Sequence, residues 1–364
     1  MSKLGTKQDS QRARYLFISS AWREGAPLED ASTLYRCIFH VLNLRASGHI
    51  ADFVPERELR QEFIEYYDRF IFHRPTYSEH IKRTIGLIIS TSKHFCCDYD
   101  DLIFDEASIM SSPRRLSGHI APEQLYDAAL NNQKAMGLFS DVIVSTQPLA
   151  QKVRALGPYK VNVIYNGYQP YWLRYSESSI EQSRAKMDNN KVKIISYFSG
   201  SASHDDDFRQ LIEPLSEVMR VYPEVTLQLV GPLKVPADAF PAGRVFRRDL
   251  VPYLSLPNIM ATTWLTLAPL NLARDFNKCK SGLKFFEAGI FGIPCAATLS
   301  EDMKRFSGHV LGLERQSDLL SIVKRYSDEA FYRAESIRIR KFALENCSSM
   351  QQTRALHELF EATK

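Results

Sequence analysis

The chain has 364 residues, of which 45% are hydrophobic and 24% are charged, and 46 basic against 42 acidic side chains give a net charge of +4. These values are close to the average of globular proteins, so they exclude a disordered chain, a coiled coil and a collagen-like polymer. A nucleic-acid-binding protein would carry a larger or more segregated basic excess, and we therefore expect no nucleic acid as a partner.

The N-terminus and the cysteines indicate a cytoplasmic protein. The chain is polar and charged until Tyr15, which is unlike a secretory signal peptide. The six cysteines are scattered without a Cys-x-x-Cys pair, so they predict neither a disulfide framework nor a zinc site. The longest near-apolar window, 282–299, contains Lys284, Glu287 and Pro294 and is not expected to span a membrane.

Short apolar runs alternate with segments of helical period along the first half, which predicts parallel strands joined by helices. The predicted strands cover residues 15–19, 51–54, 70–73, 94–97, 141–145 and 161–164. Predicted helices cover 32–47 and 123–139, and an Asn-Gly turn signal at 166–167 follows the last strand. Residues 1–170 are therefore expected to form one Rossmann-like domain.

The polar segment 171–191 is expected to link two domains, because the strand–helix pattern restarts after it. The predicted elements are strands at 192–198, 226–230, 244–246, 265–267 and 295–297, and helices at 207–222, 253–262 and 281–291. Residues 192–328 are expected to form a second Rossmann-like domain, and 329–364 two final helices.

The segment 276–294 gives the strongest functional signal, at a place where parallel sheets bind ligands. Lys280 and Ser281 stand at the predicted start of a helix, and Lys284 follows about one turn later. Free backbone N–H groups and two lysines would suit a diphosphate. Glu287, on the second turn, could face a ribose. An ordinary amphipathic helix with solvated lysines is the alternative that these residues leave open.

Lys284-Phe285-Phe286-Glu287-Ala288, followed by Gly292-Ile293-Pro294, resembles the signature of bacterial GT-B glycosyltransferases of the large family 4 clan, roughly K-x-x-E-A-x-x-x-G-x-P. Other segments are similar to the branch of that clan that assembles polysaccharides and O-antigens. They are YFSGS at 197–201 with His204, Asp207 and Phe208, LVGP at 229–232, LAPL at 267–270, FHR at 72–74 and DYDDLIFD at 98–105.

The resemblance implies an α/β protein of the GT-B type, with two Rossmann-like domains facing across a cleft and the C-terminal helices at 329–364 packing back on the first domain. It implies a glycosyltransferase that moves a sugar from a nucleotide-sugar donor to a glycan or lipid-linked acceptor in cell-surface polysaccharide synthesis. No cofactor is expected, since the nucleotide-sugar is itself the donor substrate. A lipid-linked acceptor or other assembly proteins would bring the cytoplasmic chain to the inner face of the membrane.

The resemblance and the sheet-edge argument together give the expected site. The donor-binding residues are Gly200, Ser201, His204, Asp207, Lys280, Ser281, Lys284 and Glu287, with Glu287 on the ribose. The acceptor-side residues are His73, Arg74, Asp98 and Asp101, and the catalytic residues are Asp100, Lys280 and Lys284. Asp100 would accept a proton in an inverting reaction or orient a substrate in a retaining one. The lysines would stabilise the leaving diphosphate.

The acidic cluster at 98–105 would also suit Mg²⁺ or Mn²⁺. GT-B enzymes stabilise the leaving diphosphate with helix dipoles and side chains instead, so we expect no metal.

Two departures from the clan leave alternatives open. The clan carries a Glu eight residues before the ribose Glu, where this chain has Cys279, and an Arg and a Lys after the first donor-domain strand, where 199–204 reads SGSASH. The stereochemistry is therefore open, with retention favoured by the resemblance. A non-catalytic nucleotide-sugar-binding scaffold and a sugar-nucleotide epimerase on the same fold are the alternative functions.

Overall fold

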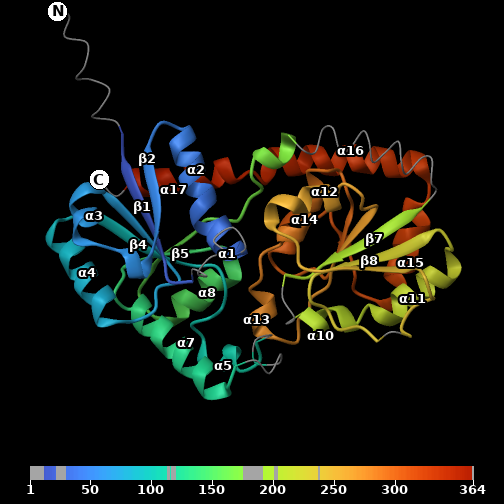
Figure 1. Ribbon diagram of the computed structural model, residues 1–364, viewed down its shortest axis with the longest axis horizontal. Helices are drawn as coiled ribbons and strands as arrows, with labels where there is room; N and C mark the ends of the chain where they lie inside the picture. The colour runs from blue at the N-terminus through green and yellow to red at the C-terminus, as the bar shows by residue number, and fades with distance from the viewer. Residues whose placement is uncertain are drawn as a thin grey trace, which may run out of the picture. The chain divides into compact units, whose positions relative to one another are not determined.

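The computed structural model describes residues 12–21, 30–112, 115, 120–174, 192–200, 204–236 and 238–362. These residues form two compact units, the first drawn from 1–109, 123–166 and 349–364 and the second from 110–122 and 167–348. Each unit is built on a six-stranded parallel sheet with helices packed against it (Figure 1). The predicted fold class, α/β with two Rossmann-like domains, is confirmed.

The first sheet has the strand order β2-β1-β3-β4-β5-β6. Its strands are β1 (Arg14–Ser19), β2 (Ile50–Pro55), β3 (Arg69–His73), β4 (His94–Tyr99), β5 (Asp141–Val144) and β6 (Lys160–Val163). The chain reverses its direction of winding between β1 and β3, where Ser19 lies opposite His73. Open parallel sheets bind their ligands at such a switch point, beyond the carboxyl ends of the strands.

Helices of the first unit connect these strands. They are α1 (Ala31–Thr33), the π-helical turn η3 (Leu34–Ile38), α2 (Phe39–Ala46), η4 (Glu56–Glu58), α3 (Gln61–Tyr66), α4 (Glu79–Ser90), α5 (Glu106–Ile109), α7 (Pro122–Met136), α8 (Gln147–Leu156) and α17 (Ser349–Glu361). The helix predicted over 32–47 is thus interrupted by a π turn, a feature that is often found near functional sites. Leu356 and Phe360 of α17 join Tyr15 and Phe17 in the core of this unit.

The second sheet has the strand order β12-β11-β10-β7-β8-β9. Its strands are β7 (Lys193–Phe198), β8 (Val225–Val230), β9 (Val245–Arg248), β10 (Leu265–Ala268), β11 (Cys295–Ala297) and β12 (Leu311–Gly312). Every predicted strand of both halves is present. Only β12 was not predicted, because a strand of two residues leaves no periodic signal. The switch point of this sheet lies between β7 and β10.

The helices predicted over 207–222, 253–262 and 281–291 are shorter or divided in the second unit. The helices of this unit are α10 (Asp205–Arg209), α11 (Ile212–Val221), η6 (Tyr253–Ser255), α12 (Leu256–Met260), α13 (Asp275–Lys278), α14 (Leu283–Gly289), η7 (Met303–Phe306), α15 (Gln316–Tyr326) and α16 (Glu329–Asn346). The single helix predicted over 207–222 is two helices. Pro214 explains the break, because it has no N–H to donate to the carbonyl of Gln210 and its ring would clash there.

Helix α16 packs on the second unit, against α14 and α15, although residues 329–364 were expected to pack together on the first domain. Two glycines allow α16 to come close. A Cβ on Gly289 would lie 3.0 Å from the Cβ of Ala343, and one on Gly292 would lie 2.8 Å from the carbonyl oxygen of Ser336. Helix α17 packs instead against α2 of the first unit.

The expected linker at 171–191 is described only in its first residues, and 175–191 lie outside the described part of the chain. Trp172 is fully buried in the second unit, with its ring 4.9 Å from that of Tyr253 and 6.1 Å from that of Phe291. The start of this segment therefore belongs to the core of the second unit.

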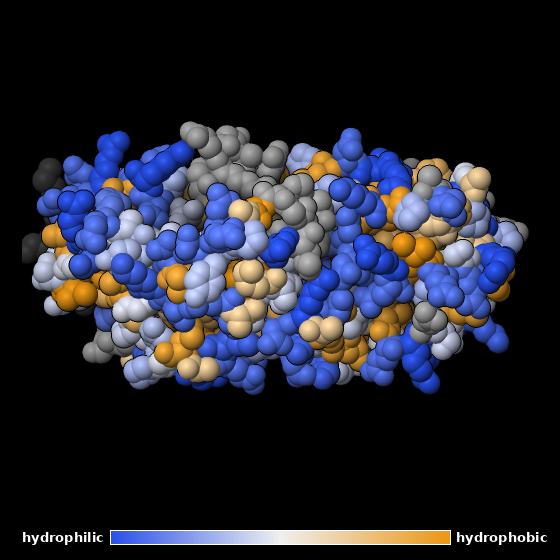
Figure 2. Space-filling model, turned by 90° about the horizontal axis from the view of Figure 1, so that it is seen from below, coloured by the Kyte–Doolittle hydropathy of each residue, from blue (hydrophilic) through white to orange (hydrophobic). Residues whose placement is uncertain are grey.

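The surface seen in Figure 2 carries hydrophobic residues in small groups among hydrophilic ones. Within the described ranges, no helix combines the length and the apolar character that are needed to cross a bilayer.

We predict that Gly292→Ala destabilises the protein by about 1–3 kcal/mol more than Gly308→Ala, as expected for an overpacked position. Both glycines have positive φ values, +71° and +82°, so both substitutions carry the cost of a left-handed alanine. Only Gly292 also has a backbone carbonyl in the way, whereas Gly308 has no atom within 4 Å of the added Cβ. Urea unfolding followed by circular dichroism measures both variants, and equal losses would show that the approach of α16 is not tight.

Candidate functional site

The carboxylate of Asp207 joins the two loops that flank the switch point of the second sheet. Asp207 lies in α10, after β7, and is 1% exposed. Its Oδ1 accepts hydrogen bonds from the backbone N–H of Asn271 (2.9 Å) and the side-chain amide of Asn277 (2.8 Å), both after β10. Its Oδ2 accepts one from Nδ1 of His204 (3.0 Å). Asp207 is thus an internal acceptor for three donors and not a helix cap.

Burial raises the pKa of Asp207, but the hydrogen bonds from His204 and Asn271 outweigh it and leave the pKa below its usual value. The group is therefore a carboxylate near neutral pH, and its charge helps to hold the loops together.

Three nitrogen side chains gather beside this carboxylate. Lys280, in the loop before α14, and Lys284, on α14, are both half-buried, and both act electrostatically on His204. Burial lowers the pKa of Lys284, and the charge of Lys280 lowers it further against the opposing effect of Glu287. The ammonium groups of Lys280 and Lys284 lie 5.1 and 5.6 Å from the ring centres of Phe276 and Tyr197. Since the charge of Lys280 acts on Lys284, an anion bound beside both would stabilise the pair.

Other predicted donor-side residues are placed as follows. Glu287 lies one turn after Lys284 on α14, is partly exposed, and is close enough to raise the pKa of that lysine. Gly200 is exposed at the end of β7, and Ser281 is partly exposed before α14. Ser201 lies outside the described residues.

The predicted anion site at the start of a helix requires a correction. Helix α14 begins at Leu283, two residues later than expected, and is seven residues long. The N–H of Gly282, its N-cap, already donates to Oδ2 of Asp302 (2.7 Å). A short helix with one of its first N–H groups occupied contributes little to an anion, so positive charge must come from the side chains.

Cys279 occupies the position at which the family 4 clan has its first Glu, and it is 2% exposed. The thiol is packed in the interior of the second unit, so this position presents no carboxylate to the cluster of His204, Lys280 and Lys284.

The first unit has a polar network at its own switch point. His73, at the end of β3, has its Nδ1 2.8 Å from the hydroxyl of Ser19 at the end of β1. Its Nε2 lies 2.8 Å from Oγ of Ser32, and the same hydroxyl donates to Oδ2 of Asp100 (2.7 Å). The hydroxyl of Ser32 donates its one proton to Asp100, so its oxygen accepts the hydrogen bond from Nε2–H of His73. A chain of hydrogen bonds therefore runs from β1 through β3 to the loop after β4.

Arg74 completes this network with an unusual backbone. Its φ is +49°, in the left-handed region that non-glycine residues rarely adopt, and its N–H donates to the carbonyl of Asp98 (2.8 Å). Its guanidinium pairs with Oδ1 of Asp100 (2.5 Å) and Oδ2 of Asp101 (3.0 Å). Such local strain persists where surrounding contacts fix it, and it is concentrated at functional sites.

The carboxyl of Asp100 is kept ionised. Burial raises its pKa, but Arg74 and His73 outweigh burial and hold the pKa well below its usual range. Its side chain is 10% exposed and that of Asp101 is 27% exposed, so both of these predicted site residues reach the surface of the unit.

Asp98 and His73 do not contact an acceptor in the way that the sequence suggests. Asp98 is 2% exposed and forms a bidentate pair with Arg36, with both N–O distances 2.9 Å. Arg36 also donates to the carbonyl of Ile164 (2.6 Å), and His73 is 0% exposed. Both side chains are therefore buried behind the carboxyl edge of the first sheet, where they hold neighbouring residues in place. Asp105, the last acid of the cluster, pairs with Lys152 at 3.1 Å.

Several residues of these networks were not predicted, namely Ser19, Ser32 and Arg36 in the first unit and Asn271, Asn277 and Asp302 in the second. Arg36 carries a usable signal, because a single charge within the apolar segment LYRCIFHVL indicates a buried ion pair. Asp302 carries none, because it reaches Gly282 from 20 residues away.

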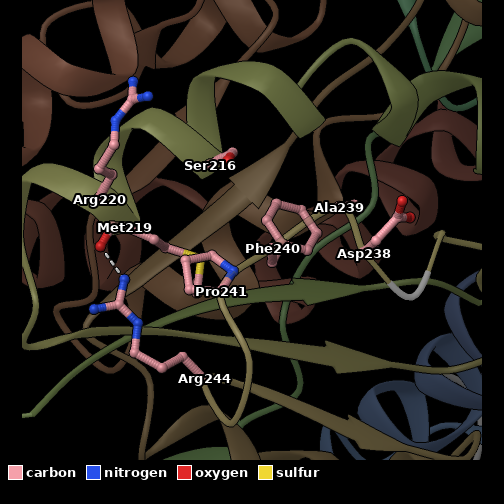
Figure 3. A pocket seen from close by; sticks show the side chains of 8 residues that line it. All are labelled: Ser216, Met219, Arg220, Asp238, Ala239, Phe240, Pro241 and Arg244. Carbon is pink, nitrogen blue, oxygen red and sulfur yellow. Dashed lines mark hydrogen bonds between the residues drawn. The ribbon is translucent and has the colours of Figure 1, made fainter.

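A hollow of about 500 Å³ lies elsewhere on the second unit (Figure 3). Ser216, Met219 and Arg220 of α11 line one side of it, and Phe240 and Arg244 line another. Arg244 directly precedes β9 and donates to the carbonyl of Pro223 (2.8 Å), shortly before β8. The hollow is therefore near the amino ends of these strands, away from the edge where parallel sheets bind ligands.

No protein-family model and no curated protein matches the chain.

Solved structures share its fold over nearly the whole length. HepE of Anabaena in complex with UDP is 14% identical, with a TM-score of 0.61 over 96% of this chain and 100% of that one. An α-glucosyltransferase in complex with UDP-glucose and DNA containing an abasic site is 11% identical, with a TM-score of 0.62 over 96% and 99%. A putative UDP-N-acetylglucosamine 2-epimerase from Listeria monocytogenes is 11% identical, with a TM-score of 0.52 over 97% and 98%. These TM-scores establish a common fold, that of GT-B proteins.

We predict that Asp100→Asn destabilises the protein at pH 7 by about 3 kcal/mol, because it leaves the buried Arg74 with Asp101 alone. Because the pKa of Asp100 is lowered in the folded protein, its ionised form stabilises the fold at every pH above the unfolded-state pKa of about 3.9. This stabilisation is lost as the pH falls below that value. The difference in the free energy of unfolding between wild type and variant should therefore be constant from pH 7 to about pH 5 and shrink below about pH 4.

Asp68→Asn is the matched control, since Asp68 also pairs with an arginine, Arg14, but is 38% exposed. Its loss should stay below about 1 kcal/mol. Urea unfolding at several pH values measures both variants, and equal losses would contradict a buried, tightly paired Asp100.

Proposed function

We propose that this protein is a glycosyltransferase that moves a sugar from a nucleotide-sugar to a glycan or lipid-linked acceptor in cell-surface polysaccharide synthesis. The second unit binds the donor and the first binds the acceptor. The reaction takes place on the cytoplasmic side of the membrane, which the chain reaches through its acceptor or through other assembly proteins.

The observation that carries this proposal is the pair of cationic side chains Lys280 and Lys284 beside His204 at the switch point of the second sheet. Two half-buried ammonium groups, one of which has a lowered pKa, form a site for a strongly charged anion. Glu287 lies on the same helix as Lys284, within reach of a ribose hydroxyl pair. Solved structures of this fold that hold UDP or UDP-glucose support a nucleoside diphosphate as the anion.

The lysines do the chemical work in this proposal, without a metal ion or a cofactor. Negative charge grows on the diphosphate as the glycosidic bond breaks, and Lys280 and Lys284 stabilise that charge. Asn271 and Asn277 keep the loops in place through Asp207, so the charges are already positioned before the reaction. Gly200, Ser201 and Ser281 would provide backbone and hydroxyl donors to the phosphates.

Asp100 and Asp101 contact the acceptor or the transferred sugar in this proposal, and Arg74, His73 and Asp98 hold them. A carboxylate with a strongly lowered pKa is a weak base. That property favours an orienting role for Asp100 and a retaining reaction. The anomeric configuration of the product, measured by NMR, tests this part.

The first experiment is a thermal-shift screen of the purified protein with UDP, GDP, CMP, ADP and dTDP sugars. A ligand at 100 times its Kd stabilises the folded state by about 2.7 kcal/mol, which is a readily measured shift. Transfer is then assayed with the selected donor and extracted lipid-linked glycans. No shift with any of these compounds would contradict the proposal.

An epimerase is the second candidate, because one solved structure with this fold is that of a putative UDP-N-acetylglucosamine 2-epimerase. NMR of the donor after incubation distinguishes the two: an epimerase inverts a carbon of the sugar without an acceptor. A scaffold, supported by the buried Cys279, would bind the donor and leave it unchanged.

We predict that Lys280→Ala and Lys284→Ala lower kcat more than donor affinity, because the charge they stabilise grows in the transition state. Lys278→Ala is the control: it removes a lysine of the same segment that is 52% exposed and pairs with Asp275. Steady-state kinetics and donor titration measure all three. A loss in kcat below about threefold for both site variants, under 1 kcal/mol, would place the diphosphate elsewhere.

We also predict that Glu287→Ala weakens nucleotide binding by about 1.5–3 kcal/mol, the worth of a hydrogen bond to a charged group. Glu301→Ala, which removes an exposed glutamate of the same unit, should leave binding unchanged. Calorimetric titration with the nucleotide measures both. Unchanged affinity in a folded Glu287→Ala protein would remove Glu287 from the ribose.

A further inference from the structure

His204 is held so that one ring nitrogen is used and the other is presented. Its Nδ1 lies 3.0 Å from Oδ2 of Asp207, and a carboxylate can only accept a hydrogen bond. Nδ1 therefore carries the proton of the neutral ring, and Nε2 carries a lone pair. Among the residues that the structure describes, Nε2 has no hydrogen-bond partner.

The contacts of Asp207 fix the orientation of the His204 ring. The other oxygen of Asp207 is fixed by Asn271 and Asn277 from the far side of the switch point, and the side chain is almost completely buried. The ring cannot turn to offer a donor without breaking the bond to Asp207. Neutral His204 would therefore repel a phosphate oxygen placed at Nε2, because two lone pairs would face each other.

The charges around the ring come from three places: Asp207 in α10, Lys280 in the loop before α14, and Lys284 on α14. Burial lowers the pKa of His204, the hydrogen bond to Asp207 raises it, and both lysines lower it. The ring is thus neutral near pH 7 when no anion is bound. A diphosphate on Lys280 and Lys284 would cancel their effect and add negative charge nearby, which favours the imidazolium.

We propose that His204 takes up a proton at Nε2 when a nucleoside diphosphate group binds beside Lys280 and Lys284, and that it then donates a hydrogen bond to a phosphate oxygen. This inference rests on the proposed donor site and adds a proton to it. The proton comes from solvent and stays on the ring while the diphosphate is bound. His204 thereby becomes a third cationic group, one that exists only in the complex.

Proton uptake makes donor binding depend on pH in a definite direction. The complex holds one more proton than the separate partners between the lower pKa of free His204 and its higher pKa in the complex, so affinity rises as the pH falls through that range. Between these two pKa values the Kd should increase by up to about tenfold per pH unit, and above the pKa of the complex it should level off. Nucleotide-sugars suit this test better than UDP, because their esterified diphosphate has no proton that titrates near pH 7.

The test is isothermal titration of the full chain with UDP-glucose, GDP-glucose and dTDP-glucose at pH 7, in PIPES and in imidazole buffer. The difference in heat between buffers of different ionisation enthalpy gives the number of protons taken up. We expect uptake of up to about one proton for whichever donor binds. His204→Gln should keep the fold and remove both the uptake and the dependence of Kd on pH.

His309→Gln is the matched control. His309 lies in the same unit, and burial and Arg338 lower its pKa, but it stacks on Phe342 and has no part in the cluster. Its replacement should leave proton uptake unchanged. Binding without proton uptake, or uptake that persists in His204→Gln, would overturn this inference alone. Failure of these three donors and of every other nucleotide-sugar of the thermal-shift screen to bind would overturn the proposed function and this inference with it.

Discussion

Parallel pairing of the strands is the constraint on which both sites depend. Each described strand runs parallel to its neighbours, so all strands of a sheet end at one edge. The winding order reverses once in each sheet, and the loops on either side of the reversal separate there and expose the edge. Hydrogen bonds cross each reversal: Ser19 to His73 between β1 and β3, and Asn271 to Asp207 between the loops after β10 and β7.

The two edges differ in their charge balance. In the first unit, Asp98 is paired with Arg36, and Asp100 and Asp101 with Arg74, so the buried charges are largely compensated. In the second unit, burial and Lys280 lower the pKa of Lys284 against the effects of Glu287 and Asp207, and burial and both lysines lower the pKa of His204. The first arrangement suits a neutral, hydroxyl-rich ligand such as a sugar. The second brings two cationic side chains together, and the proposed diphosphate site rests on that feature.

Both edges also hold conformations or charges that cost stability in the absence of a ligand. Arg74 is in a left-handed backbone conformation, and Lys284 keeps an ammonium group in a half-buried position. Neither contributes to the core. Proteins keep such costs where binding or catalysis requires prepositioned groups, and the surrounding hydrogen bonds hold them. Those hydrogen bonds are made by the buried Asp207 in the second unit and by the paired Arg36 and Asp98 in the first.

The alternation of strands and helices, and their division between two domains, could be predicted from the sequence alone, and so could the candidate segment that contains Lys280, Lys284 and Glu287. These features depend on local periodicity and on residues close together in the chain. The tertiary structure decided which polar groups are used internally. Asp98 and His73 lie at the carboxyl ends of strands, as a site residue would, yet both are buried with partners that the sequence does not place near them, such as Arg36 and Ser32. The sequence predicts a free helix start at Ser281, but the N–H of Gly282 donates a hydrogen bond to Asp302, 20 residues away. Hydrogen bonds between distant segments leave no periodic signal, because they depend on how the sheet brings its strand ends together.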